Sequence, residues 1–501
     1  MSERKVEKVV ANAFYMYLSN IANISLGALF WIIIGSIASP RDFGDALAVT
    51  SFAGVVSGVI DLGLSGAVVR FLGEYSSNEK MRLSIAQITL LAKLLIHLAS
   101  SVAIVILSLY NPALLGLQRT QIIIAALFIA LGFSSYFSSA LLGVLETKPL
   151  LISTVIGNTA KIIIALYLYL FMGLGWIAIA IGYLMVSAPL LVIGPIYLRE
   201  ILFKKEAVLS REVVWSILKA GFSIWIPGII SLIASPLIGV LIIYNVSGYL
   251  ETGGFYIATT IAGFTTALSG ALLSVSLPYI ASLRSEEISS KTATISRITR
   301  LSLSMAIPLA VPVIVFSREV LSLIREEYVG ASSILILLVF SNLISIVPGM
   351  ISNYLYAEAR YRDVLSAGFI ASVARILLYG LFAPSLGGLG ISLTYLLISI
   401  LSLAIYAYII GKEAFLSITT PSIKTLSPLI LVLVSLFRDS LEIYVNWLII
   451  FAILLALSLL LEIRTRGLDK EDLVLLARAL IPREVLSRIS PFAKTLLEIL
   501  Y

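Results

Sequence analysis

Long apolar stretches separated by short polar segments follow one another along almost the whole of this chain. Fourteen stretches can be read, near residues 14–38, 46–69, 85–109, 120–143, 150–172, 174–198, 214–243, 254–281, 301–317, 331–355, 364–383, 389–410, 423–437 and 443–463. A helix needs roughly 20 apolar residues to cross the hydrocarbon core of a bilayer. Open sheets and irregular loops cannot face lipid, because their backbone polar groups would stay unsatisfied. The pattern therefore predicts an all-α, polytopic integral membrane protein with about 14 transmembrane helices.

The predicted helices divide into two lobes of six and a final pair. The N-terminal lobe covers residues 1–199, a basic inter-lobe loop covers 200–213, and the C-terminal lobe covers 214–411. Two additional helices lie within 421–463, where Pro421 and Pro428 interrupt the first, and an amphipathic tail covers 464–501. Faint similarity between the halves, such as Phe43-Gly44 against Gly254-Phe255, is typical of parallel transporter repeats.

Composition excludes a soluble enzyme. Of the 501 residues, 59% are hydrophobic and only 13% are charged, whereas a soluble domain has about 25% charged residues. The chain has no cysteine and one histidine, so thiolate chemistry is excluded and zinc has almost no ligands. We find no G-x-x-x-x-G-K-[ST] phosphate loop, and no internal loop is long enough to hold a catalytic domain. We therefore expect a protein that is not an enzyme, with no catalytic residues, no cofactor and no metal.

The placement of the basic residues predicts the orientation. With the N-terminus inside, the inner segments before the tail collect 19 lysines and arginines, and the outer loops hold only Arg41, Arg119, Arg318, Arg325 and Arg438. Cytoplasmic loops carry such an excess. We expect a multi-pass protein of the cell (plasma) membrane with both termini in the cytoplasm. Because topology explains the net charge of +7, nucleic acid is not an expected partner.

Five ionisable residues lie deep inside predicted spans: Asp61, Lys93, His97, Lys161 and Arg375. Each central charge costs about 2.5–3.5 kcal/mol on insertion scales, so such a residue normally faces a cavity or a partner. Each also shares its helix face with small or polar residues at i±3, i±4 or i±7. We interpret them as candidate functional residues.

Two interpretations of these residues stay open. In the first, they pair across helices and fix the bundle, with Asp61 neutralising one cation. In the second, the surplus of Lys93, Lys161 and Arg375 over the single acid builds a water-filled cavity that receives an anion. His97 is as compatible with hydrogen-bonded packing as with titration. The second interpretation predicts that the three cations line one cavity and bind a phosphate group.

Short motifs add a resemblance to a known family. They are Ile37-Ala-Ser-Pro-Arg-Asp-Phe-Gly44, Asp61-Leu-Gly-Leu64, Ala67-Val-Val-Arg70-Phe71, Gly254-Phe-Tyr-Ile-Ala-Thr-Thr260, Leu277-Pro-Tyr-Ile-Ala-Ser-Leu283 and Leu323-Ile-Arg-Glu-Glu-Tyr-Val-Gly-Ala331. In their order and spacing, the chain resembles the Wzx-type polysaccharide flippases of the multidrug/oligosaccharidyl-lipid/polysaccharide (MOP) superfamily. With the helix count, the resemblance covers nearly the whole chain.

The resemblance implies two six-helix lobes around a V-shaped cavity that opens alternately to each side. It also implies a substrate made of a polyprenyl lipid, a phosphate or pyrophosphate and an oligosaccharide, carried from the cytoplasmic to the outer leaflet. Asp61 and Arg70 fall in matched motifs and join Lys93, His97, Lys161 and Arg375 as expected substrate-binding residues. Expected partners are the lipid bilayer and glycosyltransferases of the same pathway, and we expect a monomer.

The alternative is a multidrug or cation antiporter of the same superfamily. Those transporters usually have twelve spans and deep acids that couple transport to protons or sodium. Fourteen spans and an excess of deep cations argue against this alternative. The identity of the sugars, of the polyprenol and of the driving force is left open by the sequence.

Overall fold

The computed structural model describes residues 3–75, 78–111, 116–204, 211–282, 288–437 and 446–469, and every regular element within them is a helix. The chain divides into two compact units, Met1–Ile257 and Ala258–Tyr501. The predicted all-α class is confirmed. The two units are described separately below.

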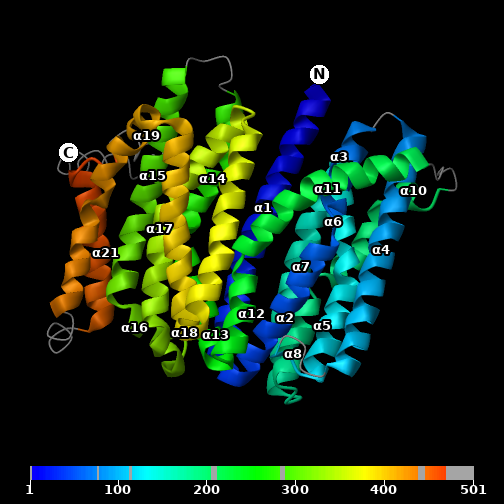
Figure 1. Cartoon of the computed structure of the whole chain (residues 1–501), viewed down its shortest axis with the longest axis horizontal. Coiled ribbons are helices and arrows are strands. Elements are labelled where there is room, and N and C mark those ends of the chain that lie inside the picture. The colour runs from blue at the N-terminus through cyan, green and yellow to red at the C-terminus, as the bar shows by residue number, and fades with distance from the viewer. Residues whose placement is uncertain are drawn as a thin grey trace, which may run out of the picture. The chain divides into compact units, whose positions relative to one another are not determined.

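The first unit is a bundle of long helices with short connections (Figure 1). Its elements are α1 (Glu3–Ile37), α2 (Pro40–Ile60), α3 (Leu64–Glu74), α4 (Glu79–Tyr110), α5 (Arg119–Leu131), η2 (Gly132–Ser134), α6 (Ser135–Gly143), α7 (Lys148–Leu170), α8 (Trp176–Leu184), α9 (Ala188–Tyr197), α10 (Arg199–Leu202), α11 (Arg211–Ala234), α12 (Pro236–Val246) and the first half of α13 (Tyr249–Thr265). Helix α1 packs on α7, and α11 and α12 pack on α2 and α3.

The second unit is built around α15, which is largely buried (Figure 1). Its elements after α13 are α14 (Ala267–Ser282), α15 (Ile288–Val315), α16 (Ser317–Ser322), η3 (Glu326–Ala331), α17 (Ser332–Ala357), α18 (Tyr361–Ile410), α19 (Lys412–Thr419), η4 (Thr420–Phe437) and α21 (Trp447–Arg464). Helix α15 contacts α14, α17, α19, η4 and α21, so it holds the C-terminal helices to the rest of the unit.

The predicted spans fall on helices that are long and apolar enough to cross a membrane. In the described residues there are 12 such helices, or 13 with the pair Tyr249–Thr265 and Ala267–Leu273, which is bent by 61°. The predicted eleventh and twelfth spans are the two helical halves of α18, which are separated by a sharp turn at Gly387 with φ 54° and ψ −129°. The count of about fourteen spans is therefore confirmed as an approximation.

Helix geometry differs from a continuous α-helix in two predicted spans that contain prolines. The seventh span breaks at Ser235, because Pro236 starts α12 instead of continuing α11. The thirteenth span is the 3-10 helix η4, which contains Pro421 and Pro428. Proline lacks the N–H that an α-helix interior needs, and in these two spans the chain leaves the α-helix beside it, whereas α15 and α17 continue through their prolines.

Helix α4 has its apolar face outward and its polar face inward. Leu91, Leu95, Leu98 and Val102 are 43–59% exposed, although α4 lies in the strongly apolar part of the sequence. Lys93 and His97 on the same helix are each only 1% exposed. A water-soluble helix has the opposite arrangement. The exposed apolar face is what a lipid environment requires.

The boundary between the two units lies at Ile257, inside the predicted C-terminal lobe. The seventh predicted span, made of α11 and α12, packs within the first unit. The predicted lobe boundaries at 199 and 214 stay a prediction. Most of the predicted amphipathic tail, from residue 470 onward, lies outside the described residues.

Cysteine labelling is expected to confirm the predicted topology. The turns after α7 and in the middle of α18 are predicted outside, but Gly175 and Gly387 have positive φ and do not tolerate a side chain. Met172→Cys and Leu386→Cys lie beside these turns at side chains that are 57% and 41% exposed. Both should react with an impermeant maleimide in intact cells, whereas Arg362→Cys should react only after lysis. The reverse pattern would invert the topology.

Candidate functional site

The predicted second span is broken at Asp61, where the candidate site begins. Helix α2 ends at Ile60, Leu62 and Gly63 have φ values of 49° and 71°, and α3 starts at Leu64. The Asp61 carboxylate accepts hydrogen bonds from Ser65, at 2.7 Å from the hydroxyl and 3.2 Å from the backbone N–H. The backbone N–H of Ser65 lies in the first turn of α3 and has no partner within the helix, so the Asp61 carboxylate supplies the acceptor.

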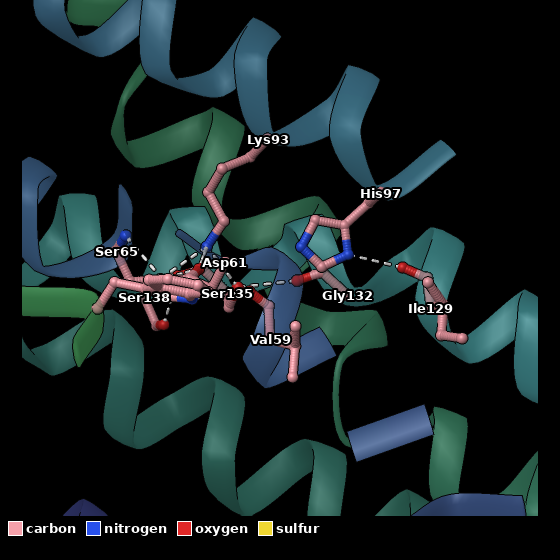
Figure 2. A network of polar contacts seen from close by, with 10 residues as sticks. Val59, Asp61, Ser65, Lys93, His97, Ile129, Gly132, Ser135 and Ser138 are labelled. Carbon is pink, nitrogen blue, oxygen red and sulfur yellow. Dashed lines mark hydrogen bonds and ion pairs between the residues drawn. The ribbon is translucent and has the colours of Figure 1, made fainter. Parts of the chain in front are cut away.

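Lys93 reaches from α4 into this break and pairs with Asp61 (Figure 2). Its Nζ lies 2.6 Å from Asp61 Oδ1, and it donates to the hydroxyls of Ser65 at 2.6 Å and Ser135 at 2.8 Å. The Lys93 side chain is fully buried and that of Asp61 is 22% exposed. All three ammonium hydrogens thus have an acceptor. The interpretation that Asp61 neutralises one cation is confirmed, and the cation is Lys93.

His97 lies one turn beyond Lys93 on α4 and points toward α5 (Figure 2). Its Nδ1 is 2.8 Å from the carbonyl oxygen of Ile129. A carbonyl can only accept, so Nδ1 carries the hydrogen. The ring also lies against Gly132, where a Cβ would come within 2.8 Å of it. This geometry supports a packing role for His97.

Lys161 lies in a separate cluster of the first unit, between aromatic rings. It projects from α7, and its Nζ donates to Asn158 Oδ1 at 2.8 Å. The same nitrogen lies 4.6 Å from the ring centroid of Phe30 and 5.2 Å from that of Tyr183. The residue is 2% exposed, and within the described part of the chain no carboxylate pairs with it. Lys161 is therefore a buried cation stabilised by dipoles and ring faces and not by an acid.

Arg375 has the corresponding environment in the second unit. It lies in the first half of α18, and its guanidinium carbon is 5.2 Å from the ring centroid of Tyr395 in the second half. Its Nε is buried without a hydrogen-bond partner, and no ion pair to Arg375 is found among the described residues. This guanidinium keeps donors that a ligand could use.

Lys161 and Arg375 have similar surroundings in two similar helix pairs, one in each unit. Each lies on the first helix of a helix pair whose turn contains a glycine of the same conformation, Gly175 (φ 55°, ψ −136°) or Gly387 (φ 54°, ψ −129°). In both cases a tyrosine follows the glycine by eight positions, and the cation lies 5.2 Å from its ring. Each unit therefore has a cation that lies over the ring of a tyrosine from the second helix of the pair, in agreement with the faint sequence symmetry. The sequence analysis missed Tyr183 and Tyr395, although their equal spacing from the glycines could have revealed them.

Arg70 does not join these clusters. It is exposed near the end of α3, where its Nε lies 3.4 Å from Glu74 Oε2 and its guanidinium lies over the ring of Phe71. Exposed pairs of this kind contribute little to stability. The structure thus brings together Asp61 and Lys93, with His97 one turn away, and places Arg70 and Lys161 elsewhere in the same unit.

A second buried acid, which the sequence analysis did not select, joins α2 to α12. Asp45 Oδ1 accepts a 2.6 Å hydrogen bond from the hydroxyl of Tyr244, and Gln121 Nε2 lies 3.1 Å from the same hydroxyl. Asp45 precedes the predicted start of the second span, which is why it was passed over. Among the described residues, no group of three or more His, Asp or Glu is placed to hold a metal ion.

Close packing at Gly63 gives a prediction about the break in the second span. A Cβ at Gly63 would overlap the carbonyl oxygen of Gly221 on α11, and φ is 71°. Gly63→Ala should therefore lower the free energy of unfolding by roughly 2–4 kcal/mol. Gly73→Ala is the matched control, because its nearest neighbour would lie 3.8 Å away. Thermal unfolding in detergent measures both, and equal midpoints would show that the break is not closely packed.

The fold is shared with known transporters. The inward closed conformation of the lipid II flippase MurJ aligns with 92% of this chain and 100% of its own, with 19% identity and a TM-score of 0.69. An inward-facing multidrug resistance MATE family transporter of the MOP superfamily aligns with 80% of this chain and 95% of its own, with 14% identity and a TM-score of 0.62. At these identities the likeness shows the fold. No curated protein sequence matches the chain with significance.

The helical membrane fold of this chain is thus the fold of a lipid II flippase and of a MATE family transporter of the MOP superfamily. The family model described as polysaccharide biosynthesis protein matches residues 9–284, more than half of the chain. The chain belongs to this family, and the resemblance found in its motifs is confirmed.

Proposed function

We propose that the protein flips a polyprenyl-(pyro)phosphate-linked oligosaccharide from the cytoplasmic to the outer leaflet by alternating access. The family model supports a role in polysaccharide biosynthesis. The fold is shared with a lipid II flippase and with a multidrug resistance MATE family transporter. The passage of a charged, hydrated headgroup through hydrocarbon is prohibitively costly without a protein path.

The observation that carries this proposal is that Lys161 and Arg375 lie inside the spans without a carboxylate partner among the described residues. A central charge in a membrane helix is retained where it has a partner or a function. An arginine fork fits phosphate oxygens, and a lysine acts as a mobile point charge. We infer that each unit supplies one of these cations to the phosphate linkage, within a cationic central cavity.

The two acids of the candidate site, Asp61 and Asp45, argue against a cation antiporter. Asp61 is paired with Lys93, and Asp45 accepts a hydrogen bond from Tyr244. Neither carboxylate is therefore available to an organic cation without first losing these partners. The predicted substrate-binding roles of Asp61, Lys93, His97 and Arg70 remain part of the proposal, with Lys93 acting only after it separates from Asp61.

The proposal also covers the location of the protein, its oligomeric state, its partners and the role of its last helices. The protein works as a transporter and not as an enzyme, in the plasma membrane, with both termini in the cytoplasm. It acts as a monomer that receives its substrate from glycosyltransferases of the same pathway. Helices η4 and α21 supply a lipid-side surface for the polyprenyl tail.

The test is a transport assay with purified protein in liposomes. A fluorescent polyprenyl-diphosphate oligosaccharide, added to one leaflet, should become accessible on the other side faster than in protein-free liposomes. Ethidium efflux under a proton or sodium gradient should not exceed that of protein-free liposomes. Ethidium efflux without movement of the lipid-linked sugar would establish the antiporter instead.

A further inference from the structure

A large basic cavity lies at one end of the second unit, away from the candidate site. Its volume is about 920 Å³, and it lies between the start of α15, α19, the start of η4 and the segment after α21. Helix α19 covers this end of the unit (Figure 1). All the connections that form the cavity are predicted to face the cytoplasm. A cavity of this size accommodates a ligand much larger than a simple ion.

Among the described residues, the charged side chains that line the cavity include more cations than acids. They are the cations Arg297, Arg300, Lys424 and Arg466 and the acids Glu413 and Asp469. Hydroxyl groups and short apolar side chains make up the rest of the lining. Arg300 and Asp469 pair with each other, and the other lining charges, three cations against one acid, still attract an anion. Arg297 and Arg466 carry the guanidinium fork that matches phosphate oxygens.

Arg300 gives the cavity a fixed wall. It is 9% exposed, its Nη1 donates to the carbonyl oxygens of Arg466 and Gly467 at 3.2 Å each, and it pairs with Asp469 at 2.6 Å. These contacts tie the end of α21 to α15. Arg300 thus fixes the backbone at Arg466 and Gly467. It is a positioning residue, because it acts through the placement of Arg466.

Arg466 adopts a strained backbone conformation at the rim of the cavity. Its φ is 58°, in the left-handed region that glycine favours. The Arg466 N–H bonds to the carbonyl of Ile463 and the Gly467 N–H to that of Glu462, the pattern of a Schellman helix end. Glycine normally occupies the left-handed position of this motif, yet the chain has arginine there and glycine one residue later. The chain thus keeps a strained residue at a place where its side chain lines the cavity. Strained backbone of this kind is concentrated at functional sites.

We propose that this cavity binds the phosphate headgroup of an anionic membrane lipid. Basic pockets between transmembrane helices on the cytoplasmic side bind such headgroups. The cavity opens at the ends of α15 and α21, where the headgroups of the adjoining leaflet lie. A bound headgroup would bridge α15 to η4 and α21 and so fasten the last two helices to the unit. Free phosphate has the same chemistry, and the experiment must separate the two sources.

The experiment measures lipid binding to the purified full-length chain by native mass spectrometry and by thermal shift in detergent. The probes are phosphatidylglycerol, phosphatidylcholine, inorganic phosphate and pyrophosphate. Phosphatidylglycerol should bind in preference to phosphatidylcholine and raise the midpoint of unfolding. The Arg297→Gln, Lys424→Gln double variant should bind it roughly thirtyfold more weakly, because each basic residue near a lipid surface contributes about fivefold. Arg362→Gln with Lys148→Gln, two exposed cations that do not line the cavity, is the matched control and should bind as the unaltered protein does.

Arg466→Gly separates binding from folding. Glycine relieves the left-handed strain, so this variant should unfold at a higher temperature in the absence of anionic lipid. Without the guanidinium, it should also gain less from phosphatidylglycerol than the unaltered protein does. A residue with a purely structural role would not change the two readouts in opposite directions.

Two results would overturn the proposal. Equal binding of phosphatidylglycerol to the unaltered protein and to both cavity variants would show that the cavity is not the lipid site. Binding of inorganic phosphate or pyrophosphate that is as strong as that of phosphatidylglycerol would assign the cavity to a soluble anion. Neither result bears on transport of the oligosaccharide substrate, so the proposed function is tested separately.

Discussion

Replacing Arg375 with alanine should abolish transport of the lipid-linked sugar without lowering the amount of folded protein. In our proposal its guanidinium binds the phosphate through charge-assisted hydrogen bonds. Removing one partner of a buried charged contact costs about 2–5 kcal/mol, which is more than roughly 30-fold in affinity or rate. Arg375 has no ion pair among the described residues, so its removal leaves no acid uncompensated. The effect should therefore fall on transport and not on stability.

Arg375→Lys should restore only part of the transport, because an ammonium keeps the charge but lacks the planar fork. Arg362→Ala is the matched control: it removes the same charge from the same helix at an exposed position before the span. The flipping rate in liposomes, normalised to folded protein measured by size-exclusion chromatography, gives the comparison. Full transport by Arg375→Ala, or equal losses in Arg375→Ala and Arg362→Ala, would exclude Arg375 as a phosphate contact.

The helices could be predicted from the sequence, because each span is specified locally by its length and apolar composition. The breaks inside spans could not be predicted equally well. Pro236 is visible in the sequence, but proline is tolerated in many membrane helices, and only the structure shows that α11 ends before it. The turn at Gly387, by contrast, falls between the predicted eleventh and twelfth spans, where the sequence places it.

The candidate residues of the site could also be found, because a charge in an apolar span is conspicuous. Their partners could not, because they come from distant helices. Ser135 lies 42 positions from Lys93 and is one of many serines, and nothing in the sequence singles it out as an acceptor. Whether Asp61 pairs with Lys93, Lys161 or Arg375 likewise depends on how the helices pack. The sequence provides the charges, and tertiary structure decides which of them remain without an acid.

Asp61→Asn should destabilise the protein by about 3–5 kcal/mol, since it leaves the fully buried ammonium of Lys93 without a counter-charge. Lys93→Met should cost less, because the remaining Asp61 carboxylate is 22% exposed and keeps its hydrogen bonds from Ser65. Thermal and chemical unfolding of the purified protein in detergent measures both losses. A larger loss for Lys93→Met than for Asp61→Asn would contradict the assigned burial of the pair.

The Asp61→Asn, Lys93→Met double variant should recover most of the lost stability, because a buried ion pair replaced by uncharged side chains is often close to neutral. Transport then separates the two interpretations of the pair. If the pair only fixes the bundle, the double variant should flip the lipid-linked sugar at nearly the normal rate. We expect transport to stay low, since the released Lys93 ammonium is one of the proposed phosphate contacts. Recovery of both stability and transport would show that Lys93 is structural and would leave Lys161 and Arg375 as the cations that bind the substrate.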